Sequence, residues 1–394
     1  MVKRGREFLH TPGPTNIPDR LLNAMHRPAM DFASPEFSAM AAQLFEDMRG
    51  LFQTSSQVFL YTSSGHGGWE GAFVNCFSPG DTVLLPEIGR FGRVWGDMAE
   101  RLGLKVVRVP GSWRHPIDAA VIEDVLTKDK DHLIKGVLAV HVETATGAIS
   151  DMPAIRRAID ASNHPALLIC DAIASFGCVP LPMEDWGIDV VIAASQKGLM
   201  LPPGLGMCAV SEKALAASFE SRSQMEYFSW PQRLKTESYS RFCGTAPEHL
   251  VFGLIEALKM LEEEGMPQVF ARHTRLANAV RKAAEVWSQA GALELNILAP
   301  DARADSLTVV RTPEGMTSDI IRSTARDTFH VAMGGGLGDL AGRVFRIGHM
   351  GDLNEPMIIG ALGGIEAALQ VCQVPIVKGG VGAAVDYLAS TAQT

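Results

Sequence analysis

The chain has 394 residues, of which 47% are hydrophobic and 20% are charged, and its formal net charge at pH 7 is −9. This composition is typical of a globular enzyme, and the length favours one large and one smaller domain over a single core. The negative charge argues against nucleic acid or an anionic membrane surface as a partner.

The elements expected in the first half of the chain form a mostly parallel sheet. The first 20 residues contain a Thr-Pro-Gly-Pro run at 11–14, which predicts an extended arm rather than a packed element. Beyond them, short apolar runs alternate with amphipathic helical patterns at 69–77, 93–103 and 152–162, as in α/β folds. Seven strands are expected, at 57–62, 81–86, 105–110, 135–143, 166–171, 189–194 and 206–211.

The second half predicts a smaller α+β domain. A long helix is expected to open at 250–264 and to continue through 270–287 into that domain. Strand patterns at 306–312 and 342–349 then alternate with helical patterns at 317–328 and 355–369. The expected division is an arm at 1–20, a large domain at 21–269 and a small domain at 270–394.

Cysteine usage and targeting signals favour a cytoplasmic protein. The six cysteines include no C-x-x-C pair and lie mostly in apolar runs, so we expect buried thiols and neither a disulfide framework nor a metal site. No span approaches the ~18 apolar residues of a membrane helix. The basic N-terminus lacks the apolar core of a signal peptide, and the C-terminus lacks a Ser-Lys-Leu tail.

Lys197 is the most informative residue, because the segment 189–210 predicts a strand, a turn that carries this lysine, and a second strand. A lysine at the end of a buried strand loses hydration, which a purely structural role rarely justifies. Asp171 lies in the preceding apolar run, 166–177. An amine that can form an imine and a buried carboxylate that can pair with a pyridinium nitrogen are the two groups that pyridoxal phosphate requires. A structural Lys–Asp ion pair is the alternative.

Two glycine-rich stretches are candidates for phosphate binding. SSGHGGWEG (63–71) joins a strand to a helix, where backbone N–H groups and the helix N-terminus favour an anion. The run 336–341 has G-x-G-x-x-A spacing, but a strand pattern resumes directly afterwards and leaves no room for the crossover helix of a dinucleotide site. We interpret this second run as a loop at or near the active site.

Six motifs together resemble the class V aminotransferases of fold type I, in the branch of the serine–glyoxylate and alanine–glyoxylate enzymes. They follow the family's order along the chain: TPGPTNIP (11–18), SSGHGGWEG (63–71), HVETATG (141–147), CDAIASFG (170–177), SQKG…PPGL (195–205) and FRIGHMG (345–351). The resemblance implies an α/β fold with a large domain on a mostly parallel seven-stranded sheet and a smaller α+β C-terminal domain. It implies pyridoxal 5'-phosphate as the cofactor.

The resemblance also assigns roles to single residues. Lys197 would carry the imine link to the cofactor and shuttle the proton, and Asp171 would keep the pyridine nitrogen protonated. Thr144 would contact the ring hydroxyl region. Arg346 would bind the substrate α-carboxylate through two hydrogen bonds, and Asn16 would line the substrate pocket.

The resemblance places the phosphate between two subunits. The expected phosphate ligands of the chain itself are Ser64, Gly65, His66 and Gln196. Thr245 would reach the phosphate from the neighbouring subunit, so a homodimer with shared active sites is expected. Phe91 matches the aromatic residue that stacks on the ring, and Trp95 is the second choice. Each of these residues also has a plain structural interpretation, as a cap or a core aromatic.

Two departures from the family pattern bear on affinity and specificity. Phe242 stands where many relatives have a tyrosine, which removes one phosphate hydrogen bond. Phe32 and Ala33 stand where relatives often have histidine and arginine, which removes a cation.

The leading hypothesis is an aminotransferase that moves an amino group from a small amino acid, serine or alanine first, to glyoxylate or pyruvate in two half-reactions. The alternatives are a pyridoxamine–pyruvate aminotransferase, an aspartate–glyoxylate aminotransferase, and a lyase or desulfurase on the same fold. A desulfurase would need a nucleophilic cysteine, for which Cys243 is the candidate.

Overall fold

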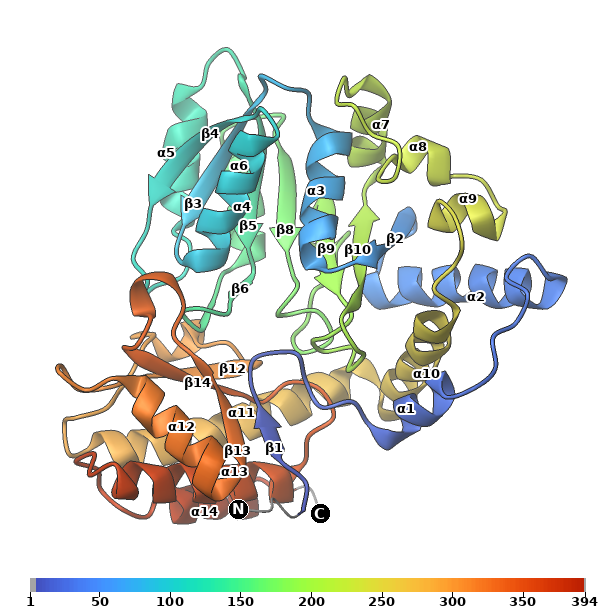
Figure 1. Cartoon of the computed structure of the whole chain (residues 1–394). Helices are drawn as coiled ribbons and strands as arrows, with labels where there is room; N and C mark the ends of the chain where they lie inside the picture. Colours follow the sequence, from blue (N-terminus) through green and yellow to red (C-terminus); the bar gives the residue numbers. More distant parts are fainter. Residues whose placement is uncertain (1–4, 393–394) are drawn as a thin grey trace.

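The computed structural model describes residues 5–392. Its larger sheet has seven strands in the order β2-β10-β9-β8-β5-β3-β4 (Figure 1). Strand β10 pairs antiparallel with both of its neighbours, and the other four neighbouring pairs are parallel. The predicted fold class is confirmed, and the seven strands are β2 (Gln57–Ser63), β3 (Thr82–Glu87), β4 (Lys105–Pro110), β5 (Ile134–Val140), β8 (Leu167–Asp171), β9 (Val190–Ala194) and β10 (Gly204–Val210).

Helices cover both faces of this sheet, as its strands require. The central strands are buried on both faces, and β9 has no exposed residue, so each face needs its own apolar layer. Alternate strand residues divide between two apolar clusters. The first cluster packs α2 (Pro35–Phe52), α5 (Ala119–Lys128), α6 (Met152–Ala161) and α10 (Glu248–Glu264) against one face. The second packs α3 (Gly65–Cys76), α4 (Arg90–Arg101) and α7 (Glu212–Glu220) against the other.

A second sheet of five strands, in the order β1-β13-β14-β12-β11, forms the core of the smaller domain. Its strands are β1 (Phe8–His10), β11 (Glu294–Leu295), β12 (Leu307–Arg311), β13 (Val331–Gly335) and β14 (Val344–Gly348). Four helices pack on it: α11 (Met266–Ser288), α12 (Ser318–Phe329), α13 (Glu355–Val371) and α14 (Gly380–Ser390). The other elements are α1 (Asp19–Met25), α8 (Trp230–Arg233), α9 (Ser238–Phe242), two 3₁₀ turns (Pro300–Ala302, Gly338–Leu340) and the hairpin β6 (Val142–Glu143) and β7 (Ala148–Ile149).

The N-terminal segment is packed, contrary to the prediction of an extended arm. Strand β1 pairs in parallel with β13, and in Figure 1 it lies among the orange and red elements of the smaller domain. Phe8 packs against the apolar cluster of that domain, and His10 is 1% exposed. The prolines and glycine that follow made the segment look irregular, while its pairing partner lies some 320 residues later and left no local signal.

The predicted long helix is two helices. Gly265, at a φ of 81°, separates α10 from α11, because an α-helix cannot continue through a residue in that region. The G-x-G-x-x-A run is a loop with a short 3₁₀ turn ahead of β14, as the sequence indicated. Within residues 5–392, no helix has the length and apolar character needed to cross a membrane.

Candidate active site

A pocket of about 200 Å³ lies at the carboxyl ends of β8 and β9, the edge of a parallel sheet at which ligands usually bind. It brings together residues from both halves of the large domain. The sequence-predicted residues that line it are Ser64, Gly65, His66, Phe91, Thr144, Asp171, Gln196 and Lys197. Four further lining residues were not predicted: Trp69, Val142, Ile173 and Ala174. Each of these four lies inside or directly beside a motif that the sequence singled out.

Lys197 follows β9 in a turn that is fixed by its own hydrogen bonds. The Ser195 hydroxyl donates to the carbonyl of Pro202 at 2.7 Å and accepts the N–H of Leu205 at 3.1 Å. The amine of Lys197 donates to the carbonyl of Pro12 in the N-terminal segment. Burial, followed by the nearby charge of Arg346, lowers the pKa of Lys197 to about 8. The fold thus brings this amine much closer to its neutral, nucleophilic form at physiological pH.

The N-terminal segment closes over this lysine. Gly13, at a φ of +86°, lies so close that a Cβ there would come within 2.5 Å of Cδ and Nζ of Lys197. The positive φ favours glycine at this position, and any Cβ there would also push the Lys197 side chain out of its place.

Asp171 ends β8 and is 4% exposed. Its Oδ1 accepts the N–H of Ile173 at 2.9 Å. Burial raises the pKa of Asp171 to about 6, against the opposing effects of the Ile173 N–H, the Trp69 indole and the charge of Lys197. A carboxylate held in this way gains from a cationic ligand group, because a positive partner offsets its lost hydration.

The aromatic side chains settle which of the two predicted candidates faces the pocket. Phe91 lines it, whereas Trp95 is fully buried and stacks on Trp69 at a centroid distance of 5.7 Å. His66 packs against the same indole at a centroid distance of 4.4 Å. Trp95 is therefore a core residue behind the pocket wall.

Arg346 lies on β14 in the smaller domain. It is not among the residues that line the pocket, but it contacts Thr144, which is. It is 8% exposed, and it donates from Nε to the carbonyl of Gly335 at 2.6 Å and from Nη1 to the carbonyl of Thr144 at 3.0 Å. Burial lowers the pKa of Arg346 to about 10. No carboxylate of residues 5–392 forms an ion pair with it, so the guanidinium has capacity for an anionic ligand.

Three residues of the sequence hypothesis lie away from the pocket. Asn16 donates to the carbonyl of Leu9 at 3.3 Å and does not line the pocket. Thr245 is exposed between α9 and α10. Phe242 packs in the core against Phe37 and Phe45, as expected of a side chain without a hydroxyl to satisfy.

The residues fit a phosphorylated pyridine aldehyde. Helix α3 begins at Gly65, so its first N–H groups and its dipole face the pocket, and the Ser64 hydroxyl makes no capping bond of its own. The Oε1 atom of Gln196 is buried and has no partner among the described residues, so this amide has unused hydrogen-bonding capacity. Asp171 suits a protonated ring nitrogen, and Lys197 suits an aldehyde.

Comparison with known proteins agrees with this geometry. The sequence profile described as Aminotransferase class-V matches residues 8–336. The chain is 43% identical to serine–glyoxylate aminotransferase of Methylorubrum extorquens, over 98% of this chain and 96% of that one. It is 40% identical to L-aspartate–glyoxylate aminotransferase of Paracoccus denitrificans, over 96% of both.

A solved structure shows the same fold. The crystal structure of pyridoxamine–pyruvate aminotransferase from Mesorhizobium loti superposes with a TM-score of 0.91 at 26% identity, over 100% of both chains. Sequence profile, close relatives and fold thus agree. The chain belongs to the class V aminotransferases, and it is a transaminase that depends on pyridoxal 5'-phosphate.

Proposed function

We propose that this enzyme transfers the amino group of a small amino acid to glyoxylate. The observation that carries the proposal is a pocket lined by Lys197 and Asp171, beside which the guanidinium of Arg346 donates to the carbonyl of the lining residue Thr144. The chain is also 40–43% identical to glyoxylate aminotransferases. Glyoxylate and a small amino acid share one carboxylate, for which Arg346 offers a planar pair of donors.

The cofactor would be held by groups from five parts of the fold. Ser64, Gly65, His66 and Gln196 would bind its phosphate, Phe91 would cover one face of the ring, and Thr144 and Asp171 would bind the ring's polar edge. These parts are the start of α3, the start of α4, the β6–β7 turn, the end of β8 and the turn after β9. When bound, the cofactor accepts the electrons released at the substrate Cα and carries the amino group between the two substrates.

The chain's own residues would supply position and protons. Arg346 would orient the substrate through its carboxylate, which places the Cα–H near the Lys197 amine. That amine, with its pKa lowered to about 8, is suited to take the proton from Cα and to return it later. Asp171 would stabilise the protonated ring nitrogen throughout.

The amino donor is proposed to be serine or alanine. A dicarboxylic donor needs a second cation, because an unpaired carboxylate in a closed pocket loses several kcal/mol of hydration. Phe32 stands where relatives often have a histidine next to an arginine. Its ring packs on Tyr239 at a centroid distance of 6.4 Å and supplies no positive charge.

Aspartate is the second candidate donor, since a close relative bears that name. Two arginines start α4 beside the pocket, and the structure distinguishes them. Arg93 forms ion pairs with Glu87 at 2.8 Å and Asp339 at 2.9 Å. Arg90 is exposed, and after burial its charge is the second cause that lowers the pKa of His66. Arg90 is therefore the first residue to test if aspartate is the better donor.

We further propose a cytoplasmic homodimer. Thr245 is exposed on the chain's own surface, which is where a residue must lie to serve the site of a neighbouring subunit. Closed two-fold pairs are also the commonest oligomers. Sedimentation should show a dimer, and an active monomer would contradict the shared site.

The test of the proposed function is a single-turnover titration of the cofactor absorbance with serine, alanine, aspartate and pyridoxamine, each followed by glyoxylate or pyruvate. We expect serine or alanine to convert the cofactor fastest and glyoxylate to restore it. If kcat/KM for aspartate exceeded that for serine and alanine by tenfold or more, about 1.4 kcal/mol, aspartate would be the amino donor. If pyridoxamine were the only compound to react, the enzyme would be a pyridoxamine aminotransferase and not an amino-acid aminotransferase.

A further inference from the structure

The carboxylate of Glu143 lies at the point where two parts of the active site meet. Glu143 belongs to β6 and is 0% exposed. Its Oε2 accepts the N–H groups of Phe91 at 2.9 Å and Gly92 at 3.2 Å, in the first turn of α4. Its Oε1 accepts the N–H of Ala145 at 2.9 Å, in the turn that follows Thr144. One side chain thus joins the helix that carries the ring-covering aromatic to the turn that carries the ring-contacting threonine.

Helix α4 depends on this distant carboxylate for its cap. Its N-cap residue is Gly89, which has no side chain to satisfy the first N–H groups. A Cβ on Gly89 would lie 2.3 Å from Cγ and 2.7 Å from Oε2 of Glu143. The φ of Gly89 is 175°, which any residue can adopt, so glycine is needed here for space alone. The carboxylate occupies the place of a capping side chain and also interacts favourably with the helix dipole.

We propose that Glu143 is a positioning residue that holds Phe91 and Thr144 in place for the cofactor, and that its charge opposes the binding of the substrate carboxylate at Arg346. The first part follows from the three hydrogen bonds. The second follows because Arg346 donates to the carbonyl of Thr144, the residue next to Glu143, so the charges of Glu143 and of the substrate carboxylate would act on one guanidinium from nearby positions. Both parts rest on the proposed roles of Phe91 and Arg346.

The charged groups around Glu143 fix the sign of this second effect. Asp171, on β8, repels the carboxylate, while Arg346, on β14, attracts it. Burial is the main cause that raises the pKa of Glu143 to about 7. Below this pH the neutral acid leaves Arg346 to the substrate. Above it the ionised carboxylate repels the substrate, so carboxylate binding should weaken as pH rises through the neutral range.

The first test is a double-mutant cycle on cofactor affinity. We expect E143A and G89A each to raise the Kd for pyridoxal phosphate about tenfold or more, and to alter the circular dichroism of the bound cofactor. E143A removes the cap, and G89A forces the carboxylate away. In the double variant the new methyl group enters the space that the glutamate has vacated, so its effect should be smaller than the product of the two single effects.

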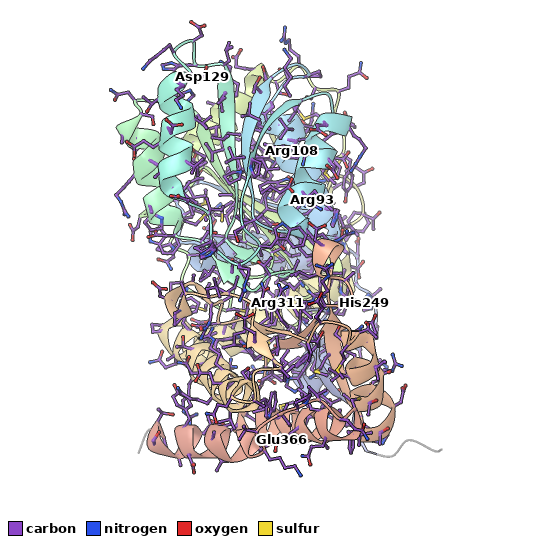
Figure 2. All side chains as sticks on the ribbon, turned by 90° about the vertical axis from the view of Figure 1, so that its left-hand side faces the viewer. Arg93, Arg108, Asp129, His249, Arg311 and Glu366 are labelled. Atoms are coloured by element: carbon purple, nitrogen blue, oxygen red, sulfur yellow. The ribbon has the colours of Figure 1, made fainter. Side chains whose placement is uncertain are left out.

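Far-UV circular dichroism shows whether each variant folds, and E87Q is the matched control. Glu87 also holds α4 in place, through Arg93 and Arg108 on its outer side (Figure 2). Among residues 5–392, Glu87 forms no hydrogen bond with Phe91 or Thr144. E87Q should keep the wild-type Kd. The positioning role would be overturned if the Kd increase of the double variant equalled the product of the two single increases to within about twofold. It would also be overturned if E143A bound pyridoxal phosphate with the wild-type Kd.

The second test uses E143Q, which keeps the size of the side chain and removes its charge. The Kd of propionate, a carboxylate without an amine, is measured on the cofactor-loaded enzyme about one pH unit either side of pH 7. In the wild type this Kd should rise several-fold between the two pH values, with an upper limit of about tenfold per pH unit. In E143Q the part of this rise that comes from ionisation of Glu143 should be absent. Identical profiles for the two proteins would contradict the charge effect. Neither test involves amino transfer, so both outcomes stand even if glyoxylate is not the acceptor.

Discussion

Two sites of this molecule, one around His349 in the smaller domain and one around Gln196 at the pocket, complete the hydrogen bonds of their buried side chains to different degrees. In the smaller domain His349 is 0% exposed, and both ring nitrogens are used, at 2.8 Å to the carbonyl of Asp305 and at 2.9 Å to the hydroxyl of Thr308. At the pocket, Gln196 and Lys197 face a cavity, and Oε1 of the glutamine has no partner among residues 5–392. Incomplete hydrogen bonding next to a cavity, more than burial, marks the functional group.

A buried side chain with spare hydrogen-bonding capacity and a fully hydrogen-bonded one occur three residues apart in one motif. Arg346 and His349 both belong to FRIGHMG, and both are buried. The arginine satisfies two of its nitrogens with backbone carbonyls and keeps capacity for an anion, whereas the histidine is complete. Variants in the two regions should therefore separate catalysis from stability.

The largest effect is expected from K197A. Removing the amine should lower kcat by more than the ~10²–10⁴-fold of a simple acid–base residue, because the covalent hold on the cofactor is lost as well. The phosphate-binding groups should still retain the cofactor. Turnover and cofactor absorbance of the purified variant measure both effects, and activity within tenfold of the wild type would contradict the assignment.

R346K should show the next largest effect. Lysine keeps the positive charge but cannot form the two parallel bonds of a guanidinium, so kcat/KM should fall roughly 10²-fold, which corresponds to about 2–3 kcal/mol. The loss should fall mainly on KM. A change smaller than threefold would mean that another residue binds the substrate carboxylate.

The pH dependence of cofactor recombination tests the environment of the lysine. The pKa of Lys197 in the folded protein, about 8, lies below the usual 10.5. The fraction of the amine that is neutral therefore rises steeply with pH up to about 8 and levels off above it. The rate at which apoenzyme captures pyridoxal phosphate should rise about tenfold per unit below that pH and then level off. A rate that keeps rising toward pH 10.5 would indicate an unperturbed lysine.

H349A should have the smallest effect on activity. It leaves the Asp305 carbonyl and the Thr308 hydroxyl without their partner, so urea unfolding should show a loss of roughly 1–3 kcal/mol. The folded fraction should keep the wild-type kcat. A lower kcat at unchanged stability would erase the distinction between the two regions.

Local patterns predicted much of the fold and of the site. The strand at 105–110 is the observed β4, and eight predicted site residues line one pocket. Trp69 and Ile173 were missed, although both lie inside motifs that the sequence had singled out. Apolar runs, and single polar residues within them, are local features of the sequence. Such features predict the strands of an α/β sheet and the polar residues at their ends.

What could not be predicted depends on contacts between distant segments. The pairing of β1 with β13 and the cap that Glu143 provides for α4 have no periodic signature. The start of α3 at Gly65 was also missed, because glycines disfavour a helix unless the surrounding structure fixes it.

The most direct test of the account is borohydride reduction of the purified, cofactor-loaded enzyme, followed by peptide mapping. We expect a single reduced adduct on the peptide that contains Lys197, with loss of the imine absorbance and of activity. An adduct on any other lysine, or none, would contradict the central claim that this lysine holds the cofactor.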